Sequence, residues 1–193
     1  MRKRVLYGIL PGFVIVMVAL YFGGSLMATP QNSGFKSSTL ASGRFGDINV
    51  FTQAVVPASQ DTDATKDGDP SEKGADVWIS KQMTKGASDL YVQSNVWQPG
   101  GSTGWHTHPG HSLIIVTAGT VTDYDGDDPT CTPHTYTATP GISVGTVDVG
   151  GGHVHLIRNE GNTVAQAVAV QLIPAGATRR IDAAAPANCA NIQ

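Results

Sequence analysis

The chain has 193 residues, of which only 14% are charged, and it contains 23 glycines and carries a formal net charge of −3. This length suits one small domain, and a composition rich in glycine and poor in charge favours short strands joined by tight turns over surface helices. Beyond the basic residues at positions 2–4, the remaining nine lysines and arginines are outnumbered by 15 acidic residues and do not cluster. Nucleic acid is thereby excluded as a partner, because phosphate binding requires clustered basic side chains.

The N-terminus combines a basic segment, MRKR, with an uncharged apolar stretch from Val5 to Ala28. This pattern is typical of a secretion signal or a membrane anchor. The stretch exceeds a usual signal core, and cleavage after Ala28 would put Leu26 where a small residue is preferred, so an uncleaved anchor is favoured over a cleaved signal. We expect residues 1–28 to form a transmembrane or signal helix, with the folded domain outside the cytoplasm, either anchored or secreted.

Three segments precede the main pattern of the domain. Residues 29–45 are rich in Ser, Thr and Gly with little apolar periodicity, and they predict a linker between the anchor and the domain. Residues 46–57 (GDINVFTQAVVP) predict a first strand. The polar, acidic residues 58–76 offer little to bury and predict a surface loop.

From Asp89 onward, short apolar or alternating segments are separated by Gly, Pro, Asn and Asp. They predict strands within residues 89–98, 104–108, 112–125, 134–140, 142–149, 153–160 and 163–174. We therefore expect residues 46–185 to form one all-β sandwich or barrel, followed by a C-terminal tail at residues 186–193.

Cys131 and Cys189 are the two cysteines of the chain. An oxidising compartment would let them form a disulfide, which would tie the C-terminal tail to the loop after Gly126. Two free thiols remain the alternative, whereas the spacing does not match a redox or zinc motif.

All six histidines lie between positions 106 and 155. Side chains two apart on a strand point to the same face, so His106 and His108 form one pair and His153 and His155 another. Two imidazoles on the inner face of a barrel, joined by a third from another strand, make a site for a divalent metal. The spacing alone leaves open which of His153 and His155 is the third ligand.

These residues resemble the motifs of the cupin superfamily. The spacing of the first motif, G-x5-H-x-H-x3/4-E-x6-G, is matched by Gly100, His106, His108, position 112 and Gly119. Ser112 stands where the family has its Glu ligand. The second motif, G-x5-P-x-G-x2-H-x3-N, is matched in part by Gly150, Gly152, His155 and Asn159.

The resemblance spans residues 88–175 and implies the cupin double-stranded β-helix, a jelly-roll barrel, with a metal held by His106, His108 and His155. His111 and His153 are the less favoured alternatives, and His111 would need a one-residue change of register to point inward. A site without the Glu leaves the metal dipositive and resembles the three-histidine thiol and diketone dioxygenases. Iron, zinc, manganese and nickel all suit such a site.

Three functions remain open from the sequence. The first is a metal-dependent oxygenase or lyase acting on a small polar substrate, with His153 or Tyr91 orienting that substrate. The second is a non-catalytic cupin that binds a small ligand or a metal outside the cytoplasm, and the third is a structural barrel with an incomplete site. Tyr91 and Trp105 are expected in the pocket lining or in the core. Cupins often form homodimers through sheet edges, and for this chain the sequence leaves the oligomeric state, a homodimer included, open.

Overall fold

A computed structural model describes residues 33–56 and 76–192. The predicted N-terminal helix, residues 1–28, and nearly all of the predicted loop at 58–76 lie outside this range. In the described part of the chain, no helix is long and apolar enough to cross a membrane.

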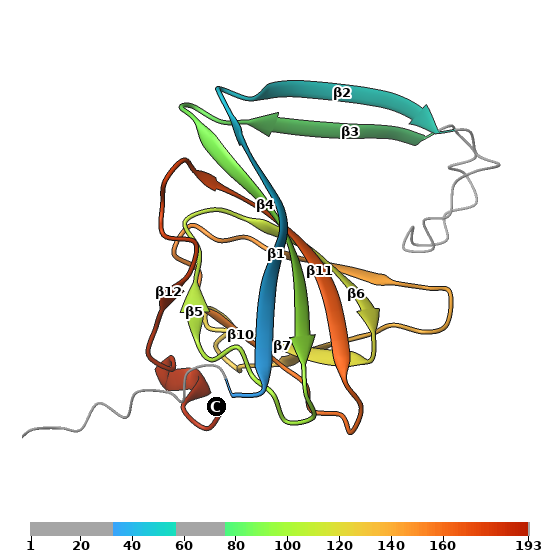
Figure 1. The fold of residues 1–193 in the computed structure, drawn as a ribbon, viewed down its shortest axis with the longest axis vertical. Helices are drawn as coiled ribbons and strands as arrows, with labels where there is room; N and C mark the ends of the chain where they lie inside the picture. Colours follow the sequence, from blue (N-terminus) through green and yellow to red (C-terminus); the bar gives the residue numbers. More distant parts are fainter. Residues whose placement is uncertain (1–32, 57–75, 193) are drawn as a thin grey trace, which may run out of the picture.

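Two five-stranded antiparallel sheets pack against each other to form a barrel (Figure 1). The first sheet has, in spatial order, the strands β1 (Phe35–Phe45), β4 (Ser88–Trp97), β11 (Ala165–Pro174), β6 (Ser112–Ala118) and β9 (Val144–Asp148). The second has the strands β12 (Ile181–Asp182), β5 (His106–Thr107), β10 (His155–Arg158), β7 (Thr120–Asp125) and β8 (Pro133–Thr137). The all-β jelly-roll barrel predicted from the sequence is confirmed.

Along a strand of the barrel wall, successive side chains alternate between the interior and the outside. On β6, Ser112, Ile114 and Val116 are buried, whereas Leu113 and Ile115 face outward. Residues from both sheets, including Trp97 of β4 and Ile157 of β10, meet in one core cluster. Both of these side chains also line the cavity that contains the histidines.

The barrel begins earlier in the chain than the predicted domain boundary. Residues 29–45 were expected to be a linker, but Phe35–Phe45 forms β1, which pairs antiparallel with β4 from Phe35↔Trp97 to Phe45↔Ser88. Nearly all residues of β1 are exposed. An edge strand of this kind needs no buried apolar face, which is why its sequence lacks the alternation that identifies the other strands.

A separate hairpin joins β1 to β4. The strand predicted within residues 46–57 exists as β2 (Asn49–Val56), but it pairs with β3 (Asp76–Met83) and not with the barrel sheets. The hairpin projects from one end of the barrel (Figure 1) and exposes Phe51, Trp78 and Ile79.

The C-terminal tail is fixed to the barrel by the predicted disulfide. Cys131 and Cys189 are bonded, and Cys189 lies in the short 3-10 helix η1 (Ala187–Cys189). Both sulfurs belong to a second buried cluster that contains Trp105, whose indole N–H donates a 2.9 Å hydrogen bond to the carbonyl of Ile192. Trp105 is therefore a core residue and not part of the pocket lining.

Candidate metal centre

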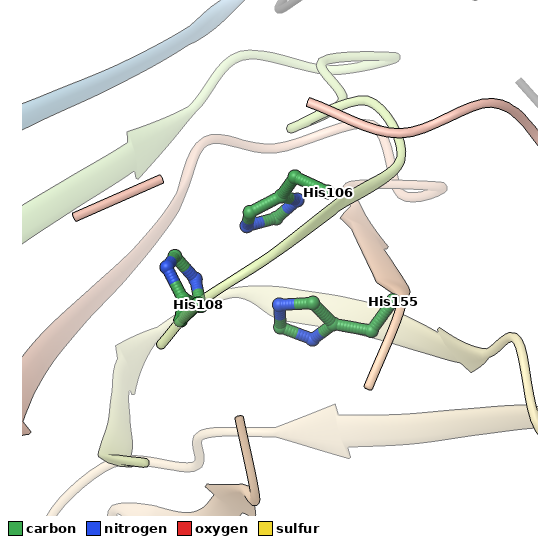
Figure 2. Close-up of side chains that lie close together, drawn as sticks. All are labelled: His106, His108 and His155. Carbon is green, nitrogen blue, oxygen red and sulfur yellow. The ribbon is translucent and has the colours of Figure 1, made fainter. Parts of the chain in front are cut away.

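Three histidines meet inside the barrel, and they are the three that the motif spacing predicts. His106 lies on β5, His108 follows that strand directly, and His155 begins β10, where it pairs in register with His106. Figure 2 shows the three rings turned toward one another, with ring centroids 4.5 Å apart for His106 and His155 and 4.8 Å apart for His106 and His108. Each ring offers one nitrogen, and these nitrogens all lie within 4.8 Å of one another.

A glycine turn holds the two histidine segments together. Gly150 has φ +62°, and a Cβ at this position would lie 1.9 Å from the carbonyl oxygen of Gly110. Only glycine fits such an approach of two backbones. The next residue, Gly151, donates a 2.8 Å hydrogen bond to the carbonyl of His108. The turn that leads to His155 is thereby fixed against the segment that follows His108.

The hydrogen bonds of the Nδ1 atoms show which ring nitrogen of His106 and His108 carries hydrogen. His106 Nδ1 lies 2.8 Å from the carbonyl oxygen of Gly104, and His108 Nδ1 lies 2.5 Å from that of Arg179. A carbonyl oxygen only accepts, so both Nδ1 atoms carry hydrogen and both Nε2 atoms present a lone pair. A metal-binding histidine typically has its other ring nitrogen held in this way.

His155 completes the group from the opposite side. Its Nδ1 lies 3.6 Å from a carboxylate oxygen of Asp123. Its Nε2 is buried and has no hydrogen-bond partner among the described residues. A buried polar atom without a partner is costly, and a metal ion at the centre of the three rings would satisfy it.

Burial and neighbouring charges shift the pKa values of the three histidines in different directions. Burial, helped by the nearby charges of His155 and Arg180, lowers the pKa of His106 to about 2. Burial also lowers the pKa of His108, so both rings are neutral at physiological pH. Burial opposes the charged form of His155 as well, but the nearby carboxylates of Asp123 and Asp148 outweigh it and raise the pKa of His155. Below this raised pKa, a metal ion that bound through His155 would displace a proton from the ring.

The cavity also holds a carboxylate that the motif did not reveal. Asp148, on β9, has a side chain that is only 1% exposed, and its Oδ2 lies 3.7 Å from His108 Nε2 and 3.9 Å from His155 Nε2. The hydroxyl of Ser112 donates to the same oxygen at 3.3 Å, and the backbone N–H of Gly150 donates to Oδ1 at 2.9 Å. Ser112 occupies the position of the motif Glu, as the sequence indicates, and the carboxylate of Asp148 comes from a different strand. The sequence held no local signal for Asp148, because its position opposite Ser112 follows from the pairing of β6 with β9.

His111 and His153, the two less favoured ligands, do not join the cluster. His111 lines a separate surface depression beside Leu172 and Ile173, because the inward position on β6 is taken by Ser112 and neighbours on a strand face opposite sides. His153 Nε2 lies 2.7 Å from a carboxylate oxygen of Asp125 in a partly exposed group that also includes Asp127.

A cavity of about 330 Å³ opens beside the three histidines. Its polar lining includes Gln93, Asn95, Gln171, Arg179 and Arg180. Tyr91, a predicted substrate-orienting residue, is absent from this lining; its ring supports the guanidinium of Arg179, which lies 4.2 Å from the ring centroid. Asn159 of the second motif has a structural role, since its side-chain amide donates to the carbonyls of Trp97 and Thr163.

Fold and site together define a double-stranded β-helix barrel with a three-histidine cluster inside. This is the cupin fold: the two sheets have the expected jelly-roll arrangement, and the histidines of both motifs lie where the motif spacing predicts. No protein-family model and no curated protein sequence matches the chain.

Solved structures similar to this chain include two proteins described by their fold and one described by its activity. A cupin superfamily protein from Desulfitobacterium hafniense is 14% identical, with 44% of this chain and 67% of that chain covered and a TM-score of 0.36. A protein with a double-stranded β-helix domain from Klebsiella pneumoniae is 20% identical, with coverages of 49% and 76% and a TM-score of 0.38. The DMSP lyase DddQ from Ruegeria pomeroyi is 18% identical, with coverages of 50% and 44% and a TM-score of 0.38. At these scores the likenesses assign no activity.

Proposed function

We propose that this protein binds one divalent metal ion through His106, His108 and His155 and is a metal-dependent enzyme, an oxygenase or a lyase, that acts on a small polar anion. The observation that carries the proposal is the convergence of three ring nitrogens in a buried site, with the other nitrogen of two rings held by backbone carbonyls. Imidazole donors suit iron, zinc, manganese or nickel and disfavour magnesium and calcium. The ion would supply a Lewis acid with open positions for a substrate.

The charges around the cavity support an anionic substrate. Arg180 donates from Nη2 to the carbonyl of Thr103 at 2.7 Å, and Arg179 donates from Nη1 to the hydroxyl of Thr39 at 2.9 Å. Both threonines line the cavity, so the two guanidiniums are held at its wall. Guanidinium groups bind carboxylates and phosphates in a defined orientation. With a volume of about 330 Å³, the cavity suits a small molecule.

A polar group of the substrate can bind on the wall opposite the metal ligands. Asn95, on β4, lines the cavity, and its Oδ1 is buried without a hydrogen-bond partner in the described part of the chain. A ligand hydroxyl or amine would satisfy this oxygen. The proposed substrate therefore carries both an anionic group and a hydrogen-bond donor.

We further propose that the domain works outside the cytoplasm. The disulfide between Cys131 and Cys189 supports this location, because such bonds persist in oxidising compartments. Membrane attachment through residues 1–28 and homodimer formation stay predictions from the sequence.

Metal analysis of the purified full chain tests the metal site. We expect about one divalent ion per chain in the parent protein and loss of this ion in His106→Ala, because two imidazoles hold a metal far more weakly than three. His134→Ala is the matched control, since His134 is an exposed histidine outside the cluster, and it should keep the ion. Unchanged metal content in His106→Ala would refute the assignment.

Turnover separates an enzyme from a binding protein. The metal-loaded chain should consume oxygen or cleave a substrate when it is screened against thiols, diketones and small carboxylic acids. The arginines predict that Arg180→Gln raises KM for the active compound more than it lowers kcat. Bound metal without turnover would instead support the non-catalytic alternative.

A further inference from the structure

The carboxylate of Asp148 lies where a fourth metal ligand would bind. We infer that Asp148 coordinates the metal together with the three histidines. The strand β9, which pairs with the strand that contains Ser112, thus supplies the carboxylate that position 112 lacks. This inference rests on the proposed three-histidine metal site. It adds a ligand from β9, an element that neither histidine motif includes.

The pairing of two strands places this carboxylate. Ser112 of β6 lies directly opposite Asp148 of β9 in the antiparallel ladder, and both residues are buried and line the cavity. Side chains of directly paired residues point to the same face of a sheet. A carboxylate on β9 at this level therefore reaches the same space as a side chain at position 112. Ser112 is small enough to leave that space open, and its hydroxyl donates to Asp148.

The distances of Asp148 to two of the three histidines fit ligands of a common ion. Asp148 Oδ2 lies 3.7 Å from His108 Nε2 and 3.9 Å from His155 Nε2. Two ligand atoms bound to one ion at about 2.0–2.2 Å are separated by roughly 3 to 4.3 Å for bond angles from 90° upward. Both distances lie inside this range.

The chemistry of the facing atoms calls for a cation between them. His108 donates from Nδ1 to the Arg179 carbonyl, so its Nε2 presents a lone pair toward an oxygen that also only accepts. Two acceptors that face each other in a buried site repel. The backbone N–H of Gly150 bonds the other oxygen, Oδ1, and does not relieve this repulsion at Oδ2. The hydroxyl of Ser112, at 3.3 Å, is a weak donor to this oxygen. A divalent ion would bind both lone pairs at once.

The consequence is a lower charge on the loaded site. Three neutral histidines leave a divalent ion with its full charge of two, whereas Asp148 as a ligand reduces the net charge of the centre to about one. The two guanidiniums of Arg179 and Arg180 at the cavity wall then become the main attraction for an anionic substrate. Ser112 acts as a positioning residue for Asp148.

Cobalt titration of the full chain tests this role, with Co²⁺ as the probe because its visible absorption reports its ligands. Asp148→Asn keeps the size of the side chain and removes its charge, and we expect it to weaken Co²⁺ binding by about 100-fold and to change the absorption spectrum. Asp47→Asn, a change at an exposed carboxylate outside the cavity and outside the group of Asp125, Asp127 and His153, should leave both unchanged. An affinity and spectrum in Asp148→Asn equal to those of the parent would overturn the inference while leaving the three-histidine site intact.

A rescue variant distinguishes a ligand from a structural role. Ser112→Glu combined with Asp148→Asn returns a carboxylate to the same space from the paired strand, and it should recover Co²⁺ affinity to within about tenfold of the parent. If these variants do not fold, a crystal structure of the Co²⁺-loaded parent decides the matter. An Asp148 oxygen about 2.0–2.2 Å from the ion supports the inference, and one beyond about 3 Å overturns it. A parent chain that binds no Co²⁺ would refute both this inference and the proposed function.

Discussion

At the scale of single residues, the three histidines differ in the group that contacts their Nδ1 nitrogen. Backbone carbonyls hold His106 and His108, whereas the carboxylate of Asp123 lies near His155. The first two rings are neutral because burial lowers their pKa values, and the third has a raised pKa because carboxylates outweigh burial. Metal binding through these three rings would therefore be coupled mainly to the proton of His155.

This coupling predicts how metal affinity depends on pH. The pKa of His155 lies above its ordinary value of 6.5, so below that raised pKa an incoming ion must displace a proton from this ring. His106 loses no proton, since its pKa is about 2. We expect affinity for Co²⁺ to rise by roughly tenfold per pH unit up to the pKa of His155 and to level off above it.

The variant Asp123→Asn checks the cause of this dependence. It removes a group that raises the pKa of His155, so the pH at which the affinity levels off should move downward. Titrations at a series of pH values measure both curves. An affinity that does not change between pH 5.5 and 8 would contradict the assignment of His155 as a ligand.

The sequence predicts those residues of the site whose positions follow from spacing along the chain. It does not predict those placed by the pairing of distant strands. His106 and His108 are two apart on one strand, and the motif spacing selects His155 over His153, so all three could be found from the sequence. Asp148 could not be found in this way. Its place beside the histidines depends on the register between β6 and β9, whose paired residues Ser112 and Asp148 are 36 positions apart.

At the scale of elements, prediction succeeded where a strand has one buried and one exposed face. The strands from β4 to β11 lie within or close to the predicted segments, because their apolar residues alternate or run together between turn residues. β1 was missed because it is an edge strand that is exposed along almost its whole length. The pairing of β2 with β3, and not with the barrel, had no signature in the sequence.

The hairpin of β2 and β3 should be dispensable for the barrel. The ends of β1 and β4 already face each other, since Phe45 pairs with Ser88. Replacing residues 46–87 with Asn-Gly would join them by a two-residue turn, which suits an antiparallel pair. We expect this variant to fold and to bind metal with the affinity of the parent, as measured by circular dichroism and cobalt titration. Loss of the folded barrel would show that the hairpin supports it.

At the scale of the whole molecule, the disulfide and the C-terminal tail close the barrel on the side of β5. Cys131, Cys189 and Trp105 share one buried cluster, and Trp105 directly precedes the proposed metal ligand His106. The tail thus packs behind the strand that carries part of the site. This arrangement was only partly predictable: the pairing of the two cysteines was expected, but the docking of the tail on Trp105 was not.

Breaking the disulfide should lower the stability of the fold. The bond closes a loop with a sequence separation of 58 residues, for which the chain-entropy model gives about 4 kcal/mol. We expect a decrease of this order in the free energy of unfolding when Cys131 and Cys189 are both changed to Ser, as measured by denaturant titration. Reductant should destabilise the parent in the same way and leave the double variant unaffected. A change below about 1 kcal/mol would show that the bond contributes little.

Anomalous diffraction from crystals of the full chain loaded with Co²⁺ tests the central claim most directly, because it locates the ion without reference to activity. The geometry predicts one strong peak inside the barrel, within bonding distance of the Nε2 atoms of His106, His108 and His155. A barrel interior without a peak, or a strong peak only at the surface group of Asp125, Asp127 and His153, would contradict it.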